Sequence, residues 1–161
     1  MHLDGKVFLV TGGASGLGEG AARALAAKGA HVAIIDRDVE AGQEIADELR
    51  GSFVEVDMCE TASIEAAVAA VAAKCGRIDG CVNCAGTGMG QLVVNRKDRI
   101  HSAEDFEFII KLNLMPAPAC AFRRYRTRPP LCHYRHAVLM LPCPRRVQSI
   151  HRSRGIVERS V

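Results

Sequence analysis

Residues 6–18, KVFLVTGGASGLG, place a short apolar run directly before a glycine-rich turn and a helix-forming segment. Residues 7–10 are apolar without polar alternation, which is typical of a central parallel strand covered on both faces. Gly12, Gly16 and Gly18 lack side chains where a backbone would approach a pyrophosphate and where the first helix would pack on the strand. The N-terminus of that helix offers unpaired N–H groups and a positive dipole end. We therefore predict a phosphate-binding strand–turn–helix.

The glycine spacing, Gly12-x-x-x-Gly16-x-Gly18, differs from the commoner G-x-G-x-x-G pattern. A tight turn without a ligand is therefore the alternative on this stretch alone. The chain that follows alternates strand-like and helix-like segments. The expected strands are residues 31–35, 52–56 and 80–83, and the expected helices are residues 19–28, 39–49 and 62–74. Strict β–α alternation implies right-handed crossovers, so we predict an α/β fold with a doubly wound, Rossmann-type parallel sheet whose C-terminal part is incomplete.

The composition changes abruptly after Met115. Up to that residue the chain has 11 Lys and Arg against 17 Asp and Glu, a net charge of −6. The remainder has 10 Arg, no Lys and one acid, Glu158, a net charge of +9, together with all six prolines. A shift this large marks a boundary between two kinds of sequence. We expect a partial dinucleotide-binding domain over residues 1–115 and an aberrant or disordered Arg/Pro-rich tail over residues 116–161.

The seven cysteines form no disulfide framework, and Asp4 interrupts the start of the chain before a signal-peptide pattern develops. We therefore expect a cytoplasmic protein. No apolar run approaches the roughly 20 residues of a membrane span, so we expect no membrane partner. Metal ligation is not expected either. Side chains three apart in a strand, as in Cys81-x-x-Cys84, point to opposite faces, and the group formed by Cys132, His133, His136 and Cys143 has no standard zinc spacing.

Two acidic residues directly follow predicted strands. Asp36 lies 18 residues past Gly18, close to the distance at which an acid accepts hydrogen bonds from the adenosine ribose and repels a 2′-phosphate. We therefore favour NAD, with NADP as the alternative because Arg37 could tolerate a phosphate. A helix cap is the other interpretation of Asp36, although Asp38 would serve as well. Asp57 holds the equivalent place after the third strand, where it could accept a hydrogen bond from an adenine amino group or simply form a turn.

Residues 87–99 look like a polar loop leaving the end of a strand, and residues 102–105, SAED, fit a capping box. The helix that this box opens carries Phe106, Ile109, Ile110 and Leu114, and also Asn113.

Together, TGGASGLG, Asp36, Asp57, the NCAG of residues 83–86 and the KLNLM around Asn113 resemble the short-chain dehydrogenase/reductase family in order and spacing. The NCAG form and AEDFEFIIKLNLM particularly resemble its type 2 3-hydroxyacyl-CoA dehydrogenases, over residues 3–115. The resemblance implies NAD-linked oxidation of a secondary alcohol such as a 3-hydroxyacyl-CoA, a small-molecule substrate, a homo-oligomer and, as an alternative compartment, the mitochondrion. It assigns Asn113 to the catalytic proton relay. The residues it implies for cofactor binding are Gly12, Ser15, Gly16, Leu17, Gly18, Asp36, Asp57, Met58, Asn83, Cys84, Ala85 and Gly86.

The chemistry of that family also needs a Ser that positions the substrate oxygen and a Tyr-x-x-x-Lys, in which the cation favours the phenolate. The last lysine of this chain is Lys111, and the residues four positions after its two tyrosines are Pro129 and Val138. We therefore expect this chain to be catalytically impaired. A tail rich in Arg but free of Lys resembles translation in a wrong frame, so we hypothesise a frameshift or aberrant splice near Met115.

Other interpretations of the tail are open. Residues 137–141, AVLML, could form a fifth strand, and the arginines could bind nucleic acid, although no helical face is predicted that would present them. Without later strands, the fourth strand would be an exposed edge and the apolar face with Phe106 and Ile110 would lack its cover. The assembly of the chain is thus in doubt, and aggregation or partial folding is expected.

Overall fold

Four parallel strands form the centre of the molecule. The structure, a computed structural model, describes residues 2–88, 102–114 and 116. The strands are β1 (Val7–Thr11), β2 (His31–Asp36), β3 (Ser52–Glu55) and β4 (Gly80–Asn83), in the spatial order β3-β2-β1-β4. Leu9 of β1 is in register with Ala33 of β2 and with Cys81 of β4. The predicted parallel sheet is confirmed, and within the described residues β4 is an edge strand.

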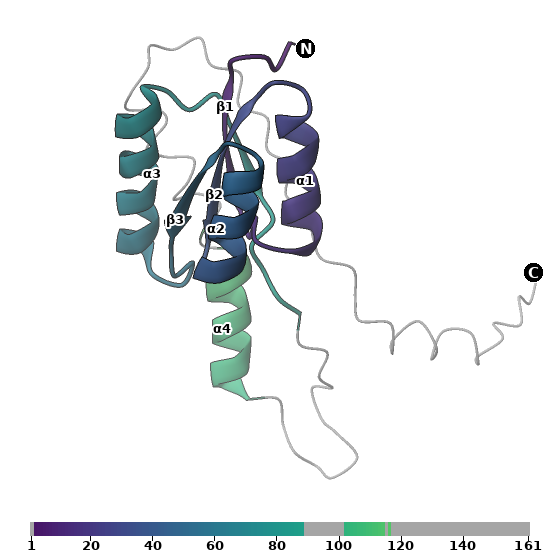
Figure 1. Ribbon diagram of the computed structural model, residues 1–161. Helices are drawn as coiled ribbons and strands as arrows, with labels where there is room; N and C mark the ends of the chain where they lie inside the picture. The colour runs from purple at the N-terminus through teal and green to yellow at the C-terminus, as the bar shows by residue number, and fades with distance from the viewer. Residues whose placement is uncertain (1, 89–101, 115, 117–161) are drawn as a thin grey trace, which may run out of the picture.

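Helices cover both faces of this sheet. The helices α1 (Gly16–Ala26) and α2 (Val39–Glu48) pack on one face, and α3 (Thr61–Cys75) packs on the other (Figure 1). Leu9 faces α3, while its neighbour Val10 faces α1 and α2, and both are almost fully buried. Because successive strand residues point to opposite faces, a strand between two helical layers is apolar throughout. This packing explains the unbroken apolar run at residues 7–10 and confirms the α/β class.

The largest boundary error concerns α1, which begins at Gly16 instead of residue 19 and ends two residues earlier than predicted. Glycine has a low helix propensity, so the sequence pattern favoured a turn through Gly18. Tertiary packing overrides this preference, because Gly18 lies in the first turn of the helix directly against the carbonyl of Gly12. The other predicted segments as far as β4 differ from the observed ones by at most one residue at either end.

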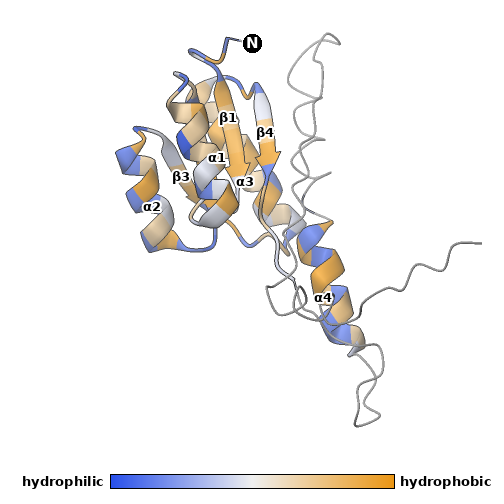
Figure 2. Ribbon diagram, turned by 90° about the vertical axis from the view of Figure 1, so that its right-hand side faces the viewer, coloured by the Kyte–Doolittle hydropathy of each residue, from blue (hydrophilic) through white to orange (hydrophobic). Residues whose placement is uncertain are grey.

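The helix α4 (Ala103–Asn113) begins where the capping box predicts. The Ser102 hydroxyl accepts a hydrogen bond from the Asp105 N–H at 3.2 Å and lies 2.6 Å from a carboxylate oxygen of Glu104. Figures 1 and 2 both place α4 beyond the C-terminal ends of the strands, clear of the helical layers. The hydropathy colouring of Figure 2 contrasts the apolar strands β1 and β4 with the mixed surface of α4. The predicted strand at residues 137–141 lies outside the described residues.

Asp79 joins the start of β1 to the start of β4. One oxygen of its mostly buried carboxylate accepts hydrogen bonds from the Val7 N–H at 3.0 Å and from Arg77 Nε at 2.7 Å. Lys6 Nζ lies 3.7 Å from the other oxygen. Burial alone would raise the pKa of this carboxyl, but the bonds from Arg77 and Val7 and the nearby positive charges outweigh it and hold the pKa below its usual range.

We expect Asp79→Asn to lower the free energy of unfolding at pH 7 by about 1–3 kcal/mol, because a charge-assisted bond network is lost. The folded pKa lies below the unfolded value of about 3.9, so the stabilisation is complete above that value and disappears as pH falls through the folded pKa. Urea unfolding followed by circular dichroism at pH 7 and at pH 3 measures this. The control Asp47→Asn, an exposed acid on α2, should change stability by less than about 0.5 kcal/mol. An equal loss for Asp79→Asn at both pH values would contradict the expectation.

Candidate dinucleotide-binding site

A cavity of about 940 Å³ opens at the C-terminal ends of the strands, between the sheet and α4. In open parallel sheets this edge is where ligands bind, at the point where the strand order reverses. In this sheet β2 and β3 lie on one side of β1, and β4 lies on the other side, so the strand order reverses at β1. Eleven of the twelve predicted cofactor residues line the cavity: Gly12, Ser15, Gly16, Leu17, Gly18, Asp36, Asp57, Met58, Cys84, Ala85 and Gly86. These eleven residues, which come from four separate parts of the chain, therefore border one cavity.

The glycine turn forms the floor of this cavity. A Cβ atom on Gly12 would lie 2.7 Å from Cα of Ala85, so the turn packs directly against the loop that follows β4. Gly12 and Gly16 have φ values of +66° and +55°, in the left-handed region that favours glycine. A Cβ atom on Gly16, by contrast, would meet open space. This turn combines a tightly packed side with an open side that faces the cavity.

The N-terminus of α1 is suited to an anion. Ser15 is the N-cap residue, but its side chain makes no capping hydrogen bond. The first-turn N–H groups of a helix have no intrahelical partner, and here they adjoin the cavity between Ser15 and Gly18. Unpaired N–H groups beside a bare glycine backbone fit the pyrophosphate of a dinucleotide.

Thr11, which was not among the predicted site residues, positions the loop opposite this turn. Its hydroxyl is buried and accepts hydrogen bonds from the N–H groups of Cys84 at 3.2 Å and Ala85 at 3.1 Å. Its position at the end of an otherwise apolar strand could have indicated this role, because a buried hydroxyl needs a hydrogen-bond partner.

Asp36 is tied to the glycine turn by its side chain. One carboxylate oxygen accepts a hydrogen bond from the Ala14 N–H at 3.0 Å, and the other accepts from the N–H groups of Arg37 at 2.8 Å and Asp38 at 3.1 Å. A carboxylate has about four acceptor positions, so one is left for a hydroxyl donor in the cavity. The N-cap of α2 is Asp38, which accepts from the Ala41 N–H at 3.1 Å. The helix cap considered for Asp36 is thus supplied by its neighbour.

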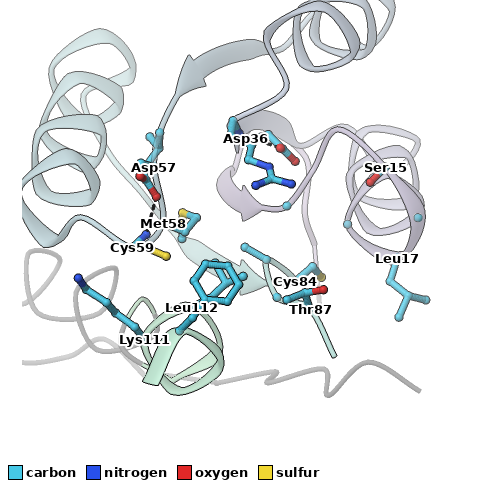
Figure 3. Close-up of a pocket in the computed structure, with 18 of the residues that line it drawn as sticks. Ser15, Leu17, Asp36, Asp57, Met58, Cys59, Cys84, Thr87, Lys111 and Leu112 are labelled. Carbon is cyan, nitrogen blue, oxygen red and sulfur yellow. Dashed lines mark hydrogen bonds between the residues drawn. The ribbon is translucent and has the colours of Figure 1, made fainter. Parts of the chain in front are cut away.

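The loop after β3 forms the opposite wall of the cavity (Figure 3). Asp57 is exposed and accepts a hydrogen bond from the Cys59 N–H at 2.8 Å, so it forms the turn considered for it and also borders the cavity. Met58 is buried beside it. Burial, followed by the charge of Asp57, raises the pKa of the Cys59 thiol, with Lys111 opposing. Burial also raises the pKa of the Cys84 thiol. Both thiols are therefore protonated at neutral pH and are poor nucleophiles.

Two predicted residues do not line the cavity. Asn83 ends β4 in register with Thr11, inside the sheet. Asn113 ends α4, where its side-chain oxygen accepts from the Thr87 N–H at 2.9 Å and its amide donates to the Thr87 carbonyl at 2.8 Å. Asn113 therefore holds α4 against the loop that follows β4, next to the cavity.

No metal centre appears among the residues that the structure describes. Cys81 packs on the α3 side of the sheet, whereas Cys84 follows the end of β4 and borders the cavity. Cys59, Cys75 and Cys84 are free thiols. The Cys81 thiol donates a hydrogen bond to Asn83 Oδ1 at 3.5 Å. The group formed by Cys132, His133, His136 and Cys143 lies outside the described residues.

The side of α4 that faces the cavity is a second feature that sequence reasoning missed. Phe108 and Leu112, four residues apart on one helical face, line the cavity, and Figure 3 shows Leu112 and Lys111 across from Asp36. The apolar face predicted from the sequence of this helix consisted of Phe106, Ile109, Ile110 and Leu114. The i, i+4 spacing of Phe108 and Leu112 was the signal for a second apolar face.

Residues 6–122 match the family model of the short chain dehydrogenases, which is most of the chain. This chain belongs to the short-chain dehydrogenase family. Among curated relatives, the 3-hydroxyacyl-CoA dehydrogenase type-2 of Drosophila melanogaster is 43% identical over 110 residues, covering 66% of this chain and 43% of the relative. The D-threitol dehydrogenase of Mycolicibacterium smegmatis is 47% identical over 90 residues, covering 53% of this chain and 35% of the relative. The chain thus spans under half the length of these relatives.

Solved structures of this short-chain dehydrogenase fold support the same assignment. A short chain dehydrogenase from Mycobacterium smegmatis superposes with a TM-score of 0.70 at 30% identity, over 78% of this chain and 54% of that one. Within the described part of the chain, no helix is both long and apolar enough to cross a membrane.

Proposed function

We propose that this short-chain dehydrogenase binds NAD in the cavity at the strand ends, and that its parent activity is NAD-linked oxidation or reduction of a secondary alcohol, with 3-hydroxyacyl-CoA as the substrate class. The observation that carries the proposal is the convergence of the glycine turn, Asp36, Asp57 and the loop at residues 84–86 on one cavity. The type-2 relatives, named for 3-hydroxyacyl-CoA, support the substrate class. When bound, NAD would accept the hydride from the alcohol.

We assign the parts of NAD to residues that line the cavity. The open N-terminus of α1 with Gly16 would hold the pyrophosphate. Asp36 has an acceptor position for a ribose hydroxyl, and its negative charge would repel the 2′-phosphate of NADP. Asp57 and Met58 would border the adenine. The remaining predicted contacts, Ser15, Leu17, Asn83 and Cys84 to Gly86, belong to the same proposal, although Asn83 does not line the cavity.

These 161 residues by themselves bind the cofactor without transferring hydride, in our proposal. Asn113 is the one member of the family's catalytic set that the chain offers, because no Tyr-x-x-x-Lys occurs in it. The partial dinucleotide-binding domain at residues 1–115 would be followed by a tail read in another frame. Translating the coding sequence after Met115 in its other two frames tests this. The absence of a Ser and a Tyr-x-x-x-Lys from both frames would contradict the frameshift.

Calorimetric titration with NAD, paired with an absorbance assay for NADH, tests the main proposal. We expect saturable NAD binding, weaker binding of NADP, and no NADH formation from NAD and 3-hydroxybutyryl-CoA. The full-length Drosophila type-2 enzyme serves as the positive control for the assay. Failure to bind NAD would overturn the site. Formation of NADH at the control rate would overturn the proposed loss of catalysis but leave the site intact.

The ten tail arginines favour a second candidate function, nucleic-acid binding through residues 116–161. Retention on a short DNA duplex that weakens steeply with salt would support it, and indifference to the duplex would exclude it. We also propose a cytoplasmic location, with the mitochondrion as the alternative, because the cysteine spacing in the sequence forms no disulfide framework.

A further inference from the structure

One face of α4 contributes an aromatic ring to the cavity at the strand ends. Phe108 and Leu112 line this cavity from the same side of the helix, four residues apart. Leu112 packs against the buried cluster that contains Val56 and Met58. Phe108, one turn nearer the N-terminus of α4, keeps 42% of its surface exposed. An exposed aromatic side chain in the wall of a cavity offers a flat apolar surface to a flat ligand.

Two sets of contacts place this face of α4 beside the loop that follows β3. The positive charge of Lys111 acts on the thiol of Cys59, and both residues line the same cavity (Figure 3). At the end of the helix, Asn113 is joined to Thr87 by two hydrogen bonds of 2.9 Å and 2.8 Å, which fix the orientation of the last turn. The apolar face of α4 therefore closes the part of the cavity that Asp57 borders.

We propose that the ring of Phe108 stacks on the adenine base of bound NAD. The inference rests on the proposed function, because it takes the ligand of the cavity to be NAD with its adenine beside Asp57. A carboxylate such as that of Asp57 would accept a hydrogen bond from the amino group at the edge of the base. The two faces of the base are then left to apolar side chains. Phe108 would cover one of them and remove apolar surface from water.

Charge distinguishes the end of the cavity at α4 from the end at α1. Glu104 and Glu107 line the cavity together with Phe108, and their negative charges would repel a phosphate but not a neutral base. The N-terminus of α1, between Ser15 and Gly18, offers the opposite environment, because its N–H groups favour an anion. This arrangement fits a nucleotide with its base at α4 and its phosphates at α1. The nicotinamide ring, which is also flat, is the competing occupant, so the test uses each half of NAD alone.

A fluorescent probe at this position tests the stacking in the full chain. The chain contains no tryptophan, so Phe108→Trp introduces a single indole into the wall of the cavity. We expect NAD and AMP to quench its emission to a plateau, because a base stacked on an indole quenches it, and nicotinamide mononucleotide to leave it unchanged. The matched control Phe106→Trp puts the same probe on α4 outside the cavity lining, and neither NAD nor AMP should quench it. Quenching by nicotinamide mononucleotide but not by AMP would overturn the assignment to adenine.

Calorimetric titration with NAD measures what the ring contributes to affinity. Phe108→Ala should weaken NAD binding about tenfold, and Phe108→Tyr, which keeps the ring, should stay within about twofold of the wild type. Phe106→Ala should leave NAD affinity unchanged, and slow hydrogen exchange in β1 and β2 verifies that each variant is folded. Equal NAD affinity in the wild type and in Phe108→Ala would overturn the stacking and leave the NAD site intact. A wild type that binds no NAD would instead overturn the proposed function, and this inference with it.

Discussion

Gly18→Ala is expected to destabilise the fold by about 3 kcal/mol and to weaken NAD binding at least tenfold. A Cβ atom on Gly18 would lie 1.9 Å from the carbonyl oxygen of Gly12 and 2.6 Å from its carbon. Both contacts are with backbone, so no side chain can rotate away. The first turn of α1 would have to move off the glycine turn, which also moves the N–H groups proposed to hold the pyrophosphate. Urea unfolding and calorimetry with NAD measure the two effects.

Gly20→Ala is the matched control for this prediction, because it makes the same chemical change two residues further along α1. Nothing lies within 4 Å of the added Cβ atom, and the position is exposed. Alanine is favoured over glycine inside a helix by about 1 kcal/mol, so this variant should be slightly more stable and bind NAD normally. A similar loss of stability in both variants would show that helix propensity, and not the contact with Gly12, governs this turn.

The fold could be predicted because each of its signals is local. An apolar run such as residues 7–10 identifies a strand buried on both sides, and glycines after helix-like segments mark their ends. The start of α1 could not be placed this way. It depends on the packing of Gly18 against Gly12, six residues earlier, and this contact forms only when the turn between them folds. Local propensity alone therefore assigned Gly16 to Gly18 to the turn.

Cavity residues that directly follow strands could be predicted from the sequence. Cavity residues that reach it only through the packing of distant elements were harder to predict. Asp36 and Asp57 could be placed because parallel strands end at one edge of the sheet. The i, i+4 spacing of Phe108 and Leu112 indicates a second apolar face on α4, but the surface that this face contacts depends on how α4 packs at that edge of the sheet. Thr11 acts through the backbone of Cys84 and Ala85, more than 70 residues away, so its partners could not be read from its neighbours.

Asp36→Ala should weaken NAD binding about 10- to 100-fold while weakening NADP binding much less. The variant removes the acceptor proposed for the ribose hydroxyl, a charged hydrogen bond of about 1.5–3 kcal/mol. It also removes the negative charge that repels a 2′-phosphate, so the preference between the two cofactors should narrow or reverse. Calorimetric titrations of each variant with NAD and with NADP give the ratio of the two dissociation constants.

Two companion variants separate the causes of this change. Asp36→Asn keeps an oxygen that can accept from the Ala14 N–H, so it should raise relative NADP affinity without disturbing the glycine turn. Asp38→Ala removes the N-cap of α2, which should lower stability by about 1 kcal/mol and leave the cofactor ratio unchanged. If Asp38→Ala altered the ratio as strongly as Asp36→Ala, a general loosening of the turn after β2 would explain the effect. A shift confined to Asp36 would instead locate cofactor choice in one carboxylate, held by three backbone N–H groups at the edge of the cavity.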